Sequence, residues 1–203
     1  MSSKLHQLTL NYSPKEDRLL LRIGTTDNTE YRLWITRRFL ASIWGALEKA
    51  LELRPSESKN LQPNVKEALM AMEHQKSIQS SDFSKKYASD NVNVTPSSPK
   101  ERHLETSKQK ERDLTFGKEE AKEQPETGAM LVIGGRIRRL NGGLTQVNLK
   151  LENKSGVEFM LNKKLLHALC HMMMKSSNKA GWQLSLSVGD PQVLMPKHLN
   201  EIH

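Results

Sequence analysis

Cysteine and long apolar runs are nearly missing from this chain of 203 residues. Cys170 is the only cysteine, so no disulfide can form within the chain, which favours a reducing compartment. The first residues lack the apolar stretch of a secretory signal, and no run approaches the roughly 18 apolar residues of a membrane helix. The sequence therefore predicts a cytoplasmic protein with no membrane partner.

Signatures of catalysis are also lacking. The chain has no phosphate-binding loop, dinucleotide fingerprint, nucleophile elbow or zinc-protease helix. Its acidic residues have no partnered histidine at a recognisable spacing. We therefore predict a protein that is not an enzyme, with no catalytic residues and no cofactor.

Aromatic residues make up only 5% of the chain, and the mean hydropathy is −0.64, so not all of it can form a packed core. Residues 55–127 are expected to be a flexible, largely disordered linker. From residue 77 onward this region is rich in Ser, Lys, Glu, Gln and Thr, and such a composition cannot offset its own ordering entropy.

One short helix is predicted inside the linker, at residues 62–75. Pro63 suits the first helical position, and Val65, Leu69 and Met72 share one face. The helix either docks on the rest of the chain or recognises a partner.

What the sequence does contain is one pattern that occurs twice, at an offset of 126 residues. Alternating apolar positions recur in the two copies: Leu21, Ile23, Leu33 and Ile35 match Val147, Leu149, Phe159 and Leu161. The polar residue and basic pair that follow also recur: Thr36-Arg37-Arg38 matches Asn162-Lys163-Lys164.

Alternation followed by a helical apolar face predicts three strands and one helix in each copy. The predicted fold is α+β, with two related βββα units, each an antiparallel meander plus one helix. The first unit spans residues 1–54, and the second spans 128–203 with an extra C-terminal strand at Trp182–Val188. Because a lone core of this size is marginal, we expect the units to pack together as an internal pseudo-dimer. Two independent small domains are the alternative.

One cluster in the second predicted helix contains residue types that bind metal ions. His167 and His171 lie four residues apart, with Cys170 beside them, but no further ligand has a recognisable spacing. We therefore expect no metal site, with solvent-facing histidines and Cys170 as a small core residue.

Charge is concentrated in the second unit. Residues 128–203 hold ten basic and four acidic residues, a net charge of +6, whereas residues 1–53 carry +2. A basic unit suits an acidic partner such as nucleic acid. The nucleic-acid or phosphate candidates are basic residues on an outer sheet face or at the starts of the two helices, namely Arg37, Arg38, Arg136, Arg138, Lys150, Lys163 and Lys164.

The outer sheet face of the first unit combines charge with apolar side chains. Leu20, Arg22, Arg32 and Trp34 point away from the core by alternation, and they are the predicted partner-binding residues. The leading functional hypothesis is a non-enzymatic cytoplasmic protein-binding or adaptor protein, with an unidentified protein partner and a composite surface from both units. The alternative is a nucleic-acid-binding protein that uses the basic C-terminal unit.

Overall fold

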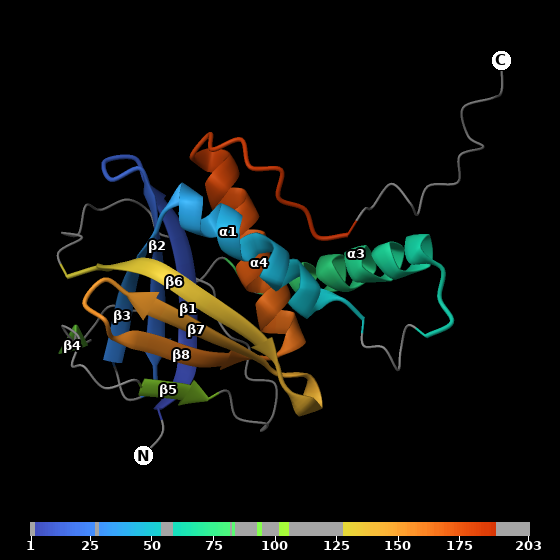
Figure 1. The fold of residues 1–203 in the computed structure, drawn as a ribbon, viewed down its shortest axis with the longest axis horizontal. Coiled ribbons are helices and arrows are strands. Elements are labelled where there is room, and N and C mark those ends of the chain that lie inside the picture. Colours follow the sequence, from blue (N-terminus) through green and yellow to red (C-terminus); the bar gives the residue numbers. More distant parts are fainter. Residues whose placement is uncertain are drawn as a thin grey trace.

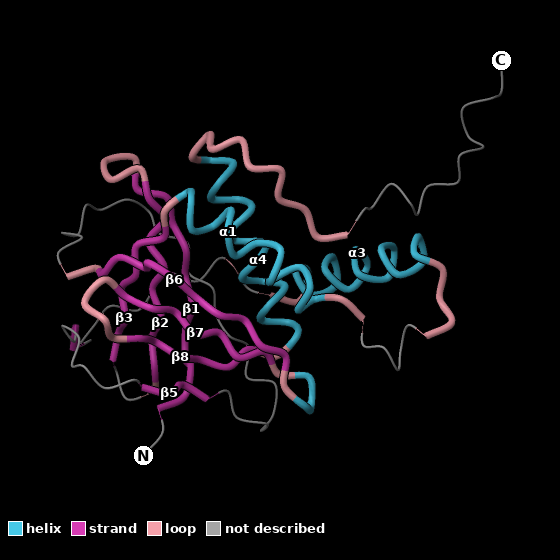
Figure 2. The backbone as a smooth tube through the Cα atoms, viewed as in Figure 1, coloured by secondary structure: helices cyan, strands magenta, loops and turns pink. Residues whose placement is uncertain are grey.

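The computed structural model describes residues 3–26, 29–53, 59–81, 83, 93–94, 102–105 and 128–189. These residues form an α+β structure with one mixed sheet of six long strands and two short ones, together with three α-helices (Figure 1). Figure 2 shows the helices gathered on one side of the strands.

The first half of the chain is an antiparallel meander followed by a helix. Strands β1 (Ser3–Ser13), β2 (Arg18–Thr25) and β3 (Thr29–Ile35) pair in sequence order, and α1 (Arg37–Leu51) follows. Helix α1 begins where it does because the side chain of Thr36 accepts a hydrogen bond from the backbone N–H of Phe39, at 3.1 Å.

The second half has the same order of elements. Strands β6 (Met130–Arg139), β7 (Thr145–Leu151) and β8 (Gly156–Leu161) form an antiparallel meander, and α4 (Lys163–Lys179) follows. The side chain of Asn162 accepts from the N–H of Leu165 at 2.9 Å and so caps α4.

Strands from both halves join in one sheet. Strand β3 runs parallel to β6, and β5 (Arg102–Glu105) pairs in parallel with both β1 and β8. Since β2 also pairs with both β1 and β3, these pairings form a closed ring, and β4 (Asn93–Val94) adds to β3. The two halves are therefore not independent domains.

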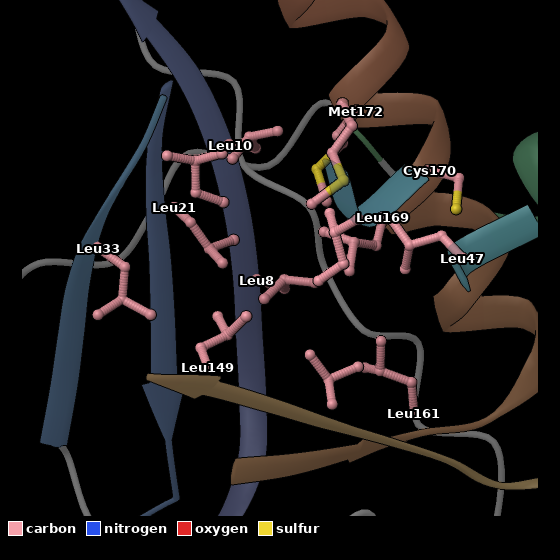
Figure 3. Packing of buried hydrophobic residues seen from close by; sticks show 14 of the residues in the cluster. Leu8, Leu10, Leu21, Leu33, Leu47, Leu149, Leu161, Leu169, Cys170 and Met172 are labelled. Carbon is pink, nitrogen blue, oxygen red and sulfur yellow. The ribbon is translucent and has the colours of Figure 1, made fainter. Parts of the chain in front are cut away.

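The apolar sides of the two meanders face one core. Leu21 and Leu33 point from β2 and β3 toward Leu149 of β7 and Leu169 of α4 (Figure 3). Helix α1 packs on β6, α4 packs on β1, and the two helices contact each other. A Cβ atom at Gly135 in β6 would lie only 3.0 Å from the side chain of Ile43, so a glycine lets α1 approach this strand.

The predicted linker contains the third helix, α3 (Pro63–Gln79), which is longer than the predicted 62–75. Residues 93–94 and 102–105, also in that predicted linker, contribute the short strands β4 and β5. Most of the rest of the predicted linker, at residues 55–58, 82, 84–92, 95–101 and 106–127, lies outside the described residues.

The C-terminal segment corrects one prediction. Trp182 and Val188 are buried, with half-buried and exposed residues alternating between them, but this segment forms no strand. An alternating pattern sets which side chains are buried, whereas a strand also needs a neighbouring strand edge to pair with. The segment instead reaches α3, where a Cβ atom at Gly189 would lie 2.7 Å from the backbone nitrogen of Ala71.

Candidate interaction surfaces

The predicted partner-binding face of β2 and β3 is covered within the chain. The exposed fractions of Leu20, Arg22 and Trp34 are only 8%, 5% and 6%, and Arg32 is partly buried. Strand alternation correctly separated these residues from the apolar core face, but it could not indicate that their own face is covered too.

The two arginines of this face are paired with one buried carboxylate. Glu30 accepts from Nε of Arg22 at 2.5 Å, and from Nε and Nη2 of Arg32 at 3.1 and 3.2 Å. Burial by itself would raise the pKa of Glu30, but the hydrogen bonds and charges of Arg32 and Arg22 outweigh it and hold that pKa below its usual value. Glu30 therefore balances one of the two positive charges of this arginine pair inside the molecule.

A second face, on β6 and β7, is basic and open. Arg136, Arg138 and Lys150 are exposed. Lys150 lies opposite Gly134 in the strand register, and Arg136 and Arg138 follow at the next two alternate positions of β6. The structure thus brings these three predicted phosphate-binding residues onto one face.

Three further residues of this face were missed by sequence reasoning. Glu158 of β8 accepts from Nε2 of Gln146 at 2.6 Å and from Nδ2 of Asn148 at 3.1 Å. Alternation along β7 and β8 could have predicted that Gln146, Asn148 and Glu158 share a face with the arginines. It could not have predicted the hydrogen bonds that join them.

The other predicted basic residues lie at the starts of the two long helices. Arg37 and Arg38 are exposed on the first turn of α1. On the first turn of α4, Lys163 and Lys164 are half-buried, and Lys163 forms an ion pair with Glu73 of α3. A depression of about 300 Å³ opens beside Lys163, lined also by Arg139, by Ala50 of α1, and by residues of the β6–β7 turn.

Helix α3 docks on α4, but through a different face from the predicted one. Its buried residues are Ala68, Ala71 and His74. The face predicted from the sequence stays outside: Val65 and Met72 are 39% and 53% exposed, and Leu69 between them is partly buried. We call these three residues, Val65, Leu69 and Met72, the α3 stripe.

The contact between α3 and α4 contains a pair of histidines. Nδ1 of His74 lies 3.2 Å from Nδ1 of His167, and His167 is fully buried. The expectation that His167 faces solvent is therefore wrong: α3 covers it. Burial lowers the pKa of His74 to about 4 and that of His167 to about 3, and the charges of His171, Lys163 and the paired ring act in the same direction.

Within the described ranges, no group of three or more His, Cys, Asp or Glu residues is arranged to hold a metal ion. Cys170 is fully buried, as expected of a core residue, and burial raises the pKa of its thiol. Among the helices that the structure describes, none has the length and apolar character needed to cross a membrane.

In comparisons with known proteins, no family model, no curated protein and no solved structure matched the chain.

Proposed function

We propose that this chain is a non-enzymatic interaction protein that binds a partner protein through α3. In this proposal the two halves are related βββα units packed as an internal pseudo-dimer, and the pseudo-dimer is the platform on which α3 is displayed. Support for the relation comes from spacing: β2, β3 and α1 each precede β7, β8 and α4 by about 126 residues, and Thr36 and Asn162 cap their helices in the same way.

The observation that carries the proposal is the outward position of the α3 stripe. Val65, Leu69 and Met72 follow the i, i+4, i+7 spacing of one helical face, and that face is turned away from α4. Ala68, Ala71 and His74 are buried in the docked face and Met70 packs against the core beside them, whereas a helix that only needed to dock would be expected to bury Val65 and Met72 as well.

Docking on α4 also prepares α3 for binding. An isolated helix of this length is marginal in water, so a free segment would have to order itself on its partner. Because α3 is already held by Ala68, Ala71 and His74, that ordering cost is met before binding.

The stripe also indicates the chemistry of the partner. Lys76 is exposed one turn beyond Met72 and continues the same side of the helix. The partner that fits is an apolar surface, such as the face of an amphipathic helix, with a carboxylate near the C-terminal end of the stripe.

Site-specific photocrosslinking in the native cell tests the proposal. A benzophenone amino acid at Met72 is expected to give a discrete protein adduct that survives nuclease treatment. The same group at Glu67, which is exposed on α3 on the side away from Met72, is the matched control and should give little of that adduct.

A second variant keeps the experiment specific. Val65→Asp places a charge in the stripe without touching the docked face, so it should abolish the Met72 adduct and leave thermal stability within a few degrees of the original. Equal adducts from positions 72 and 67, or an adduct that persists in Val65→Asp, would show that the α3 stripe is not the binding element.

A further inference from the structure

The outer face of β6 and β7 carries positive charge that nothing in the described part of the chain neutralises. No ion pair among these residues involves Arg136, Arg138 or Lys150. One carboxylate, Glu158, lies on the same face, and the amides of Gln146 and Asn148 hydrogen-bond to its two oxygens. Arg136 faces Asn148 in the register, and Asn148 faces Glu158, so the amide stands between the guanidinium and the carboxylate.

The face of β2 and β3 shows the opposite arrangement. There Glu30 accepts directly from both arginines, and the group is buried. Two regions on the outer side of the sheet thus differ: on β2 and β3 the arginines are enclosed and paired, whereas on β6 and β7 they are in solvent beside amides that hydrogen-bond to Glu158. Arg136, Arg138 and Lys150 are exposed next to one another, and the carboxylate of Glu158 is hydrogen-bonded to two amides. Such a surface suits a polyanion, which supplies the negative charge that the face lacks.

We propose that the β6–β7 face, defined by Arg136, Arg138, Lys150, Gln146 and Asn148, is a binding surface for single-stranded nucleic acid. Arg136, Arg138 and Lys150 contact successive phosphates. Glu158 holds Gln146 and Asn148 in place by accepting one N–H from each. The oxygen and the second N–H of each amide bond to the bases.

The shape and chemistry of the face favour an unpaired strand over other polyanions. Reading a duplex needs an element that enters a groove, whereas a row of side chains on strands matches an extended backbone. The bases of an unpaired strand offer donors and acceptors to the amides, which a sheet of lipid head groups does not.

Binding by the full chain to a fluorescent single-stranded oligonucleotide, measured by anisotropy over a salt series, tests the proposal. Three phosphate contacts predict a log–log salt slope of about −2, since each contact on a single strand contributes about 0.7. Arg136→Gln/Arg138→Gln should flatten that slope by about 1.4 and weaken binding by at least about tenfold at low salt.

The chain offers a matched control for the loss of charge. Lys175→Gln/Lys179→Gln also removes two positive charges, from an exposed site at the C-terminal end of α4 that is not among the predicted phosphate-binding residues, and should change the slope little. Circular dichroism of both variants confirms that each is folded before binding is compared.

Several outcomes would overturn the proposal. One is a dissociation constant weaker than about 100 μM for the original chain at near-physiological salt, the weak end of ordinary non-specific affinity. Others are equal losses in the two double variants, tighter binding to a duplex of the same length, or equally Arg136- and Arg138-dependent binding to anionic phospholipid vesicles. If Arg136→Gln/Arg138→Gln leaves oligonucleotide affinity unchanged but makes the chain aggregate, the arginines only protect the sheet from pairing between chains.

Discussion

Nδ1 of His74 lies 3.2 Å from Nδ1 of His167 where α3 crosses α4, although 93 residues separate the two in the chain. At this distance one ring can donate its Nδ1–H to the lone pair of the other, which requires the accepting ring to be neutral with its proton on Nε2. The contact therefore couples the docking of α3 to the protonation state of two buried side chains.

Acid should weaken the fold through this pair. The pKa values of His74 and His167 fall to about 4 and about 3 in the folded chain, from about 6.5 when unfolded, so the unfolded state binds more protons below about pH 6.5. Stability is complete above that pH and is lost progressively as the pH falls toward 3. Between pH 7.5 and pH 5, urea unfolding should show a loss on the order of 3 kcal/mol.

A double variant assigns that loss to the pair. His74→Leu/His167→Leu has no group to protonate at this contact, so most of the difference between pH 7.5 and pH 5 should disappear. His6→Gln, an exposed histidine in β1, should keep the original pH dependence. If the double variant retains it as well, the acid sensitivity arises elsewhere.

Glu30 should be costly to neutralise. Glu30→Gln removes, in a buried position, the negative charge to which both Arg22 and Arg32 donate. Loss of one partner from such a cluster is expected to lower the free energy of unfolding by about 3 kcal/mol. Chemical denaturation measures the change, and Glu16→Gln, in the exposed β1–β2 turn, should stay within about 0.5 kcal/mol of the original.

Two adjacent glycines of β6 should respond differently to alanine. At Gly135 the new Cβ atom would meet Ile43 at 3.0 Å, Phe39 at 3.1 Å and a backbone oxygen at 3.2 Å, so Gly135→Ala forces α1 away from the strand. We expect a loss of about 1–3 kcal/mol. At Gly134 the nearest atom is 3.8 Å away, so Gly134→Ala should be neutral or slightly stabilising in the same unfolding experiment.

Trp182 should anchor the segment that follows α4. Its ring is buried, it lies edge-on to Tyr12 at 6.3 Å, and its indole N–H donates to Asp17 at 3.0 Å. Trp182→Ala should lower the free energy of unfolding by about 3–5 kcal/mol, because it opens a cavity in the core. Trp182→Phe keeps part of the ring contact and should lose less; an equal loss would mean that the N–H bond, rather than packing, holds the segment.

The sequence by itself determined the local elements. Alternating apolar residues located β2, β3, β7 and β8, and the two helices begin directly after Thr36 and Asn162 because each residue caps its helix with its own side chain. The burial of Cys170 was also readable from its place beside the apolar face of α4. These features depend on neighbours a few residues away, which a sequence pattern records.

Only the tertiary structure decided what lies against each face. Periodicity predicted that Trp34 and Arg136 both lie on outer sheet faces, yet Trp34 is buried and Arg136 is exposed. Alternation predicts on which side of a strand a residue lies, but not whether another part of the chain covers that side. The same limit applies to α3, where the predicted apolar face stays outside and His74 turns inward to His167. Contacts between residues about 90 positions apart, and the pairing of strands from both halves into one sheet, come from the folded chain as a whole and from no local pattern.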